Sequence, residues 1–152
     1  MGMHETFHYD SLVELVEEAT ELGLELKFLG DTSIIGSPLK IDDFTIPNRA
    51  VIQPMEGCDG NKDGSPSDLT FRRYRRFGGS GAGLCWFEAT AVKKEAQANP
   101  RQLYLCEETK NEFAKLLQVY EEEEEKLGSE SDQPSFRKGL KILQLTHSGR
   151  YS

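Results

Sequence analysis

The 152-residue sequence has only three cysteines, Cys58, Cys85 and Cys106, and none of them belongs to a CxxC pair. An odd number of widely separated cysteines argues against a disulfide framework and against a zinc site. We therefore expect reduced thiols with mainly structural roles. His4 and His8 lie close to the start of the chain without a third donor at ligand spacing, so we expect no metal there.

Long apolar runs and excess basic charge are also missing. No stretch approaches the roughly 18 apolar residues that span a membrane, and residues 1–10 lack the features of a signal peptide. The 18 Lys and Arg against 26 Asp and Glu give a net charge of -8, which repels the phosphates of nucleic acids and anionic lipids. We therefore expect a cytoplasmic protein without a nucleic-acid or membrane partner. The 37% hydrophobic and 29% charged residues are typical of one globular domain.

The first part of the sequence predicts a helix followed by a hairpin. Apolar residues recur at intervals of three and four over residues 10–22, which predicts an amphipathic helix. We place this helix outside the main core, in an N-terminal helical extension of residues 1–36. The short apolar segments Leu39–Ile41 and Phe44–Ile46 flank the turn-forming pair Asp42-Asp43 and predict a small hairpin.

The remainder alternates between strands and helices. The predicted order is a strand at 50–53, a helix from 67 or 68 to about 77, a strand at 84–89, a helix near 109–126 and a strand at 141–145. These connection lengths favour parallel neighbours with right-handed crossovers. We expect the second strand to be buried on both faces and the polar stretch Gly128–Arg137 to be a mobile surface connection. The pattern fits a doubly wound sheet or the start of a (β/α)8 barrel, and both place the chemistry beyond the carboxyl ends of the strands.

Two clusters have alternative interpretations. The glycines within Gly78–Gly83 follow a helix and open a strand, the reverse of a phosphate-binding loop, and so predict a helix end with tight packing. The arginines of the first crossover helix would bind an anionic ligand such as a phosphate group, but pairing with carboxylates on a solvated face is the favoured interpretation. They are Arg72, Arg73, Arg75 and Arg76.

Polar side chains stand at two strand ends. An amide is costly to leave unpaired after an apolar strand, so Gln53 and Gln144 would bond either a bound polar ring edge or neighbouring loops. His147 follows the third strand and would face the same place. A catalytic role and a structural or substrate-positioning role for His147 are equally supported, because no nucleophile partner can be identified.

Three segments resemble a known family in order and spacing. They are Ile46-Pro47-Asn48-Arg49-Ala50-Val51-Ile52-Gln53-Pro54-Met55, Glu88-Ala89-Thr90-Ala91-Val92 and Gln144-Leu145-Thr146-His147-Ser148-Gly149-Arg150. Over about residues 37–151 the chain resembles the N-terminal third of the old yellow enzyme family of NADH:flavin oxidoreductases. The resemblance implies a (β/α)8 TIM barrel that binds FMN, is reduced by NADH or NADPH, and is reoxidised by an electron-poor alkene or another acceptor.

The resemblance also assigns site residues. The cofactor-binding positions that it implies are Gln53, Pro54, Met55, Glu56, Ala89 and Gln144, and the substrate-side positions are Cys58, His147 and Arg150. Glu56 stands where the family often has Cys or Thr. A carboxylate pointed at the flavin would disfavour its anionic reduced form and lower its potential.

Length limits what this chain is expected to do. A (β/α)8 barrel needs about 250 residues, so we expect an α/β fold made of the first three βα units, residues 37–152, with an open edge at the third strand. The predicted function is the N-terminal portion of an FMN-dependent NAD(P)H oxidoreductase, inactive alone. The alternative is a non-catalytic part-barrel that acts as an assembly or interaction module, for example as a homo-oligomer through the open edge.

Overall fold

The computed structural model describes residues 8–130 and 138–149. The chain divides into two compact units, Met1–Thr32 and Ser33–Ser152, four residues before the division predicted from sequence. The first unit contains the predicted amphipathic helix, α1 (Leu12–Glu21). Its first turn is capped by the Ser11 hydroxyl, which accepts a hydrogen bond from a backbone N–H of that turn.

The second unit begins with a short 3-10 helix, η1 (Ser33–Gly36), which the sequence pattern did not predict. The hairpin that follows is confirmed: β1 (Leu39–Ile41) pairs antiparallel with β2 (Phe44–Ile46). Asp42 in the connecting turn has a φ of 49°, a left-handed conformation that aspartate tolerates better than most residues.

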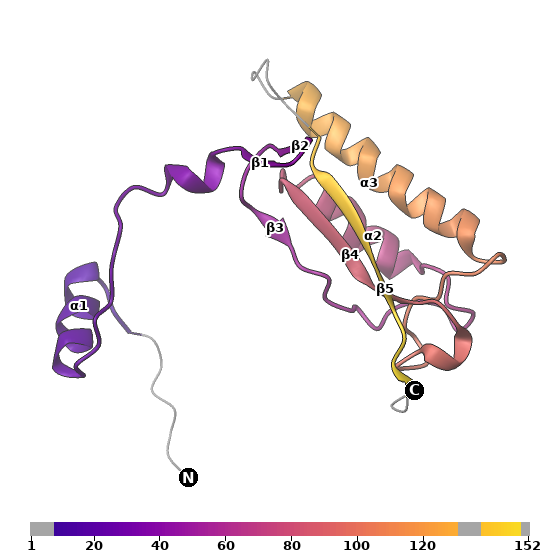
Figure 1. Ribbon diagram of the computed structural model, residues 1–152, viewed down its shortest axis with the longest axis horizontal. Helices are drawn as coiled ribbons and strands as arrows, with labels where there is room; N and C mark the ends of the chain where they lie inside the picture. The colour runs from indigo at the N-terminus through magenta and orange to yellow at the C-terminus, as the bar shows by residue number, and fades with distance from the viewer. Residues whose placement is uncertain (1–7, 131–137, 150–152) are drawn as a thin grey trace, which may run out of the picture. The chain divides into compact units, whose positions relative to one another are not determined.

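A three-stranded parallel sheet forms the centre of this unit (Figure 1). Its strands are β3 (Val51–Ile52), β4 (Leu84–Ala91) and β5 (Leu140–Thr146), in the order β3-β4-β5. The crossover helices are α2 (Asp68–Gly78) and α3 (Lys110–Glu130). The predicted α/β alternation is therefore confirmed, with a shorter first strand and longer second and third strands.

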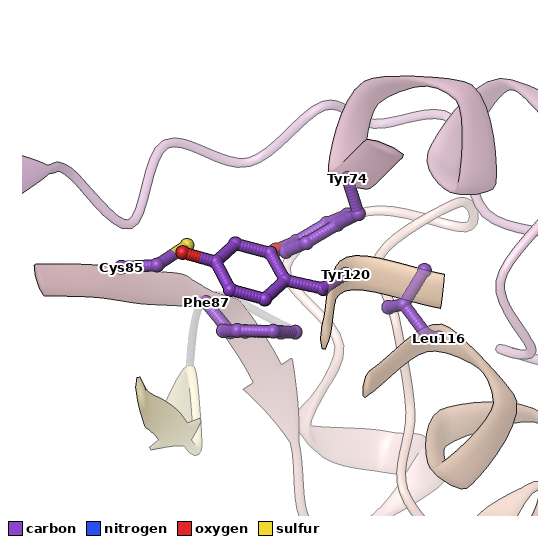
Figure 2. Packing of buried hydrophobic residues seen from close by; sticks show 5 residues of the cluster. All are labelled: Tyr74, Cys85, Phe87, Leu116 and Tyr120. Atoms are coloured by element: carbon purple, nitrogen blue, oxygen red, sulfur yellow. The ribbon is translucent and has the colours of Figure 1, made fainter. Parts of the chain in front are cut away.

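Both helices pack on one face of this sheet. Tyr74 of α2 and Leu116 and Tyr120 of α3 form a buried cluster with Cys85 and Phe87 of β4 (Figure 2). The Phe87 ring centroid lies 4.6 Å from that of Tyr74 and 5.6 Å from that of Tyr120. One strand residue thus holds both helices against the sheet through aromatic contacts.

The opposite face of the sheet is open within the described residues. Val51 and Trp86 on this face are 43% and 38% exposed, and Trp86 stands beside Ile142 of β5 in the strand register. The expectation that the second strand is buried on both faces is therefore wrong at Trp86, because both described crossover helices lie on the other side. Three strands in this order leave β3 and β5 as sheet edges, and the described residues form no closed barrel.

The glycine cluster ends α2 and lets it pack closely on its neighbours. A Cβ on Gly78 would lie 2.3 Å from the carbonyl oxygen of Tyr120, and one on Gly83 would lie 2.4 Å from that of Asn48. Gly81 has a φ of 74°. The interpretation of the cluster as a helix end with tight packing is confirmed.

Helix α3 continues further than predicted. It reaches Glu130, so the expected mobile connection at Gly128–Arg137 is wrong for its first three residues. Lysine–glutamate ion pairs with i,i+3 spacing stabilise the exposed side of this helix. Residues 131–137 lie outside the described part. No helix in 8–130, and none in 138–149, has the length and apolar character needed to cross a membrane.

Candidate functional site

The loops after β3 and β4 meet at the carboxyl end of the sheet. The β4–α3 loop contains a short 3-10 helix, η2 (Lys94–Ala96). Its Tyr104 N–H donates to the Gly64 carbonyl of the β3–α2 loop at 2.9 Å, and its Leu103 carbonyl accepts from the Ala91 N–H at 2.8 Å. Backbone hydrogen bonds therefore join the loop after β3 to the loop after β4.

A β-bulge lies within β4 at this end of the sheet. The register against β5 shifts between Phe87 and Thr90, so that Glu88 and Ala89 together oppose Gln144. A bulge redirects side chains and is frequent beside functional sites. Here it turns Glu88 towards α2 and leaves two of the residues assigned to the cofactor, Ala89 and Gln144, opposite each other.

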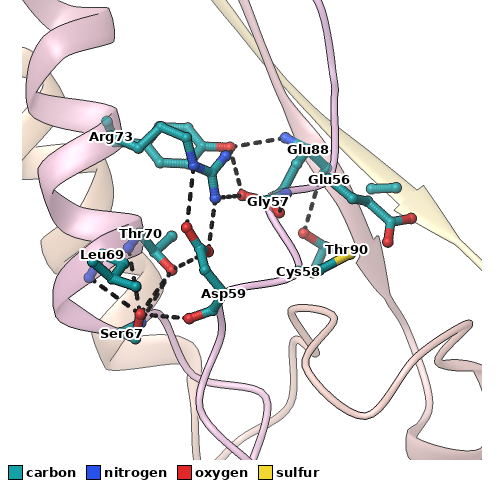
Figure 3. A network of polar contacts seen from close by, with 12 residues as sticks. Glu56, Gly57, Cys58, Asp59, Ser67, Leu69, Thr70, Arg73, Glu88 and Thr90 are labelled. Carbon is teal, nitrogen blue, oxygen red and sulfur yellow. Dashed lines mark hydrogen bonds and ion pairs between the residues drawn. The ribbon is translucent and has the colours of Figure 1, made fainter.

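Glu88 is a buried carboxylate with a full set of partners (Figure 3). It is 2% exposed, and its oxygens accept hydrogen bonds from Arg73 Nη2 at 2.7 Å, the Tyr74 hydroxyl at 3.3 Å and the Gly57 N–H at 2.9 Å. The same Arg73 nitrogen lies 2.8 Å from Asp59 Oδ1. Burial lowers the pKa of Arg73, but its bonds to Asp59 and Glu88 outweigh this and raise it. The network ties the loop after β3 to both α2 and β4.

The four arginines of α2 therefore differ in whether they pair with carboxylates. Pairing with carboxylates is confirmed for Arg73. Arg72, Arg75 and Arg76 are exposed and form no ion pair with any carboxylate of the described residues. The solvated-face interpretation fits these three side chains.

Glu56 is bound to two amides of the β4–α3 loop. Its Oε1 accepts from Gln102 Nε2 and its Oε2 from Asn99 Nδ2, both at 3.1 Å. Burial and the charge of Glu88 raise the pKa of Glu56, while the bond from Asn99 works in the opposite direction. Figure 3 shows its carboxyl group directed away from Arg73. Sequence reasoning missed Gln102, because one glutamine in a polar loop has no distinguishing pattern.

The two strand-end amides have hydrogen-bonding capacity to spare. Gln53 is exposed and Gln144 half-buried, and neither side-chain amide has a hydrogen-bond partner among the described residues. Gln144 has the same parity along β5 as Ile142, which places it on the open face. Pro54 is half-buried and Met55 is 75% exposed. Amides that each offer a donor and an acceptor fit the polar edge of a heterocycle such as a flavin.

The residues assigned to the substrate side lie in different surroundings. Cys58 is exposed, has a φ of 48°, and its Sγ lies 3.5 Å from Asn99 Nδ2. His147 is exposed after β5, where its Nδ1 accepts from the Gly149 N–H at 3.0 Å. Arg150 lies outside the described residues. No three potential metal ligands gather in the part of the chain that the structure describes.

No protein-family model and no curated protein matches the sequence, but solved structures match the fold. The structure of TcOYE with pHBA shares 25% identity at a TM-score of 0.59, over 78% of this chain and 28% of that chain. An old yellow enzyme homologue from Zymomonas mobilis shares 21% identity at 0.57, over 74% and 28%. Morphinone reductase shares 21% identity at 0.60, over 78% and 27%.

The chain is similar in fold to old yellow enzymes. This similarity confirms the resemblance inferred from the three sequence segments. The match covers only part of those structures: the chain spans about 28% of their length.

Proposed function

We propose that this chain forms one side of the FMN site of an NAD(P)H-dependent oxidoreductase of the old yellow enzyme type. The supporting observation is the bulge that sets Ala89 opposite Gln144, where an amide without a partner among the described residues lies at the carboxyl end of a parallel sheet. Ligands of open α/β sheets bind beyond the carboxyl ends of the strands, and TIM-barrel sites lie at the same ends, so both rules favour this location.

In this proposal, each residue contacts a different part of the flavin ring. Gln53 and Gln144 bond the polar edge of the ring, Met55 and Pro54 pack along it, and the small side chain of Ala89 permits close approach. Bound FMN supplies hydride transfer from NADH or NADPH to an electron-poor alkene or another acceptor. The chain's own residues bind and orient the ring and keep water from it.

Binding and turnover separate in this proposal. Because the chain spans about 28% of the matched structures, we propose that it binds FMN but does not turn over NAD(P)H by itself. His147 keeps a substrate-side role, as does Cys58, whose thiol is exposed on the loop after β3. Sustained NAD(P)H oxidation by the pure 152-residue chain would contradict the second half of the proposal.

The test is a titration of FMN into the purified chain, followed by quenching of flavin fluorescence. The substitution Gln144→Leu removes one or two hydrogen bonds of about 1 kcal/mol each, so affinity should fall about five- to thirtyfold. Gln118→Leu is the matched control, because Gln118 is an exposed residue of α3 whose side-chain amide bonds Glu122 and no other group of the described residues. Equal affinity of the two variants, or no FMN binding by the unmodified chain, contradicts the proposal.

An assembly module is the second candidate function, favoured by the edge of β5, which no strand of residues 8–130 or 138–149 pairs with on its outer side. A hollow of about 300 Å³ runs beside this edge and is lined by apolar side chains, including Phe113, Leu117 and Leu143. Leu117 and Leu143 are 39% and 37% exposed. An unpaired parallel edge next to apolar surface favours association with a second copy. A stable dimer that binds no flavin and dissociates on Leu143→Glu would support this candidate, and a flavin-binding monomer would exclude it.

A further inference from the structure

One buried side chain, Gln102, touches all three strand ends. It is 1% exposed. Its Nε2 lies 3.1 Å from Glu56 Oε1, 3.1 Å from the Ala89 carbonyl oxygen and 3.3 Å from Thr146 Oγ1. These acceptors belong to the loop after β3, to β4 and to β5. The two hydrogens of one NH2 group are therefore shared among acceptors from three parts of the site.

The opposite end of the Gln102 amide fixes its orientation. Its Oε1 accepts from the Ala98 backbone N–H at 2.7 Å, and a backbone N–H only donates. The loop is held further by Gln97, whose Nε2 donates to the Gln102 carbonyl at 2.7 Å. A flipped amide would set NH2 against the Ala98 N–H and its oxygen against the Glu56 carboxylate and the Ala89 carbonyl oxygen, neither of which donates. The NH2 group must therefore face Glu56.

Within the described residues, no cation balances the charge of Glu56. None of the lysines and arginines in the described ranges forms an ion pair with it. The titratable groups that face it are Glu88 of β4 and Cys58 of its own loop, the latter through the shared Asn99. Two neutral amides donate to the carboxylate, and the bond from Asn99 opposes the effect of burial and of the like charge of Glu88 on its pKa. Each carboxylate oxygen keeps a further acceptor position for a ligand.

We propose that Gln102, together with Asn99, is the positioning residue for Glu56, holding the carboxylate in one orientation at the strand ends and keeping it anionic there. Glu56 then acts as a fixed acceptor, which favours a ligand edge with an N–H or O–H group and disfavours an anionic one. The effect on bound flavin rests on the proposed function. The orientation and charge of Glu56 do not.

The test follows the titration of Glu56 in the full chain labelled with carboxyl-¹³C glutamate, without flavin. Its NMR signal is identified by its loss in Glu56→Gln. Removal of either donor, by Asn99→Ala or Gln102→Met, should raise the midpoint by about one pH unit, a tenfold gain in proton affinity. Gln97→Met removes an amide of the same loop that does not touch Glu56 and should leave the midpoint in place.

Unchanged midpoints in both donor variants overturn the proposal, and so does an equal shift in Gln97→Met, which would indicate a general loosening of the loop. Where Gln102→Met loses its far-ultraviolet circular dichroism, Asn99→Ala decides alone, because Asn99 lies on the rim of the site. The FMN titration separates the two hypotheses. Absence of FMN binding contradicts the proposed function, whereas the Glu56 midpoints still decide the positioning.

Discussion

Replacing Arg73 with methionine tests how the loop after β3 is held. Arg73, Asp59 and Glu88 together have a net charge of -1, and Arg73→Met changes it to -2 while keeping most of the apolar stem. Glu88 is 2% exposed and the Arg73 side chain 22% exposed. Removing one partner of a buried ion pair costs about 3–5 kcal/mol, and partial access of water to Arg73 favours the lower end. We expect a loss of about 3 kcal/mol in the free energy of unfolding.

Urea denaturation followed by Trp86 fluorescence measures this loss, because Trp86 is the only tryptophan and lies in β4 two residues before Glu88. Arg72→Met is the control: the side chain is exposed, so the change should stay within about 0.5 kcal/mol. The double variant with Arg73→Met and Glu88→Gln removes the stranded charge and should recover about 1–2 kcal/mol. A difference below about 1 kcal/mol between Arg73→Met and Arg72→Met would refute the reasoning.

Two further predictions concern the core. Gly78→Ala should lower the free energy of unfolding by about 1–3 kcal/mol, because the new Cβ would lie 2.3 Å from the Tyr120 carbonyl oxygen. Gly79→Ala is the control and should be tolerated, because a Cβ there would lie 3.7 Å from its nearest neighbour. Equal urea midpoints of the two variants would contradict this prediction. Burial raises the pKa of Cys85 to about 12. After treatment with a thiol reagent at pH 8, mass-spectrometric mapping should therefore find Cys58 labelled and Cys85 unlabelled until the protein unfolds. Labelling of Cys85 in the folded protein would contradict its burial.

The alternation of elements could be predicted from sequence because each has its own local signal. The residues of β4 are almost continuously apolar, and Ser67 supplies the cap of α2 that its sequence indicates. Exposure of Trp86 could not be predicted, since it depends on which face the two crossover helices cover. The end of α3 was also misplaced, because a run of glutamates followed by polar residues has no apolar periodicity, although ion pairs along the helix stabilise it.

The site was predictable only in part. Gln53 and Gln144 are recognisable as amides at the ends of apolar strands. The bulge between Phe87 and Thr90 is invisible in the sequence, because it arises from how β4 and β5 are aligned and leaves the composition of each strand ordinary. The bond between Glu88 and Arg73 depends on that alignment, so it could not be predicted from the sequence.

The bulge makes the length of β4 as important as its composition. With one residue fewer between Phe87 and Thr90, the strand would regain strict alternation and Glu88 would turn to the opposite side of the sheet. Its hydrogen bond to Gly57 would then be lost together with its ion pair to Arg73. A one-residue deletion in a strand would thus release a loop that is 31 residues earlier in the chain, an effect that no single side-chain substitution at Ala89 reproduces.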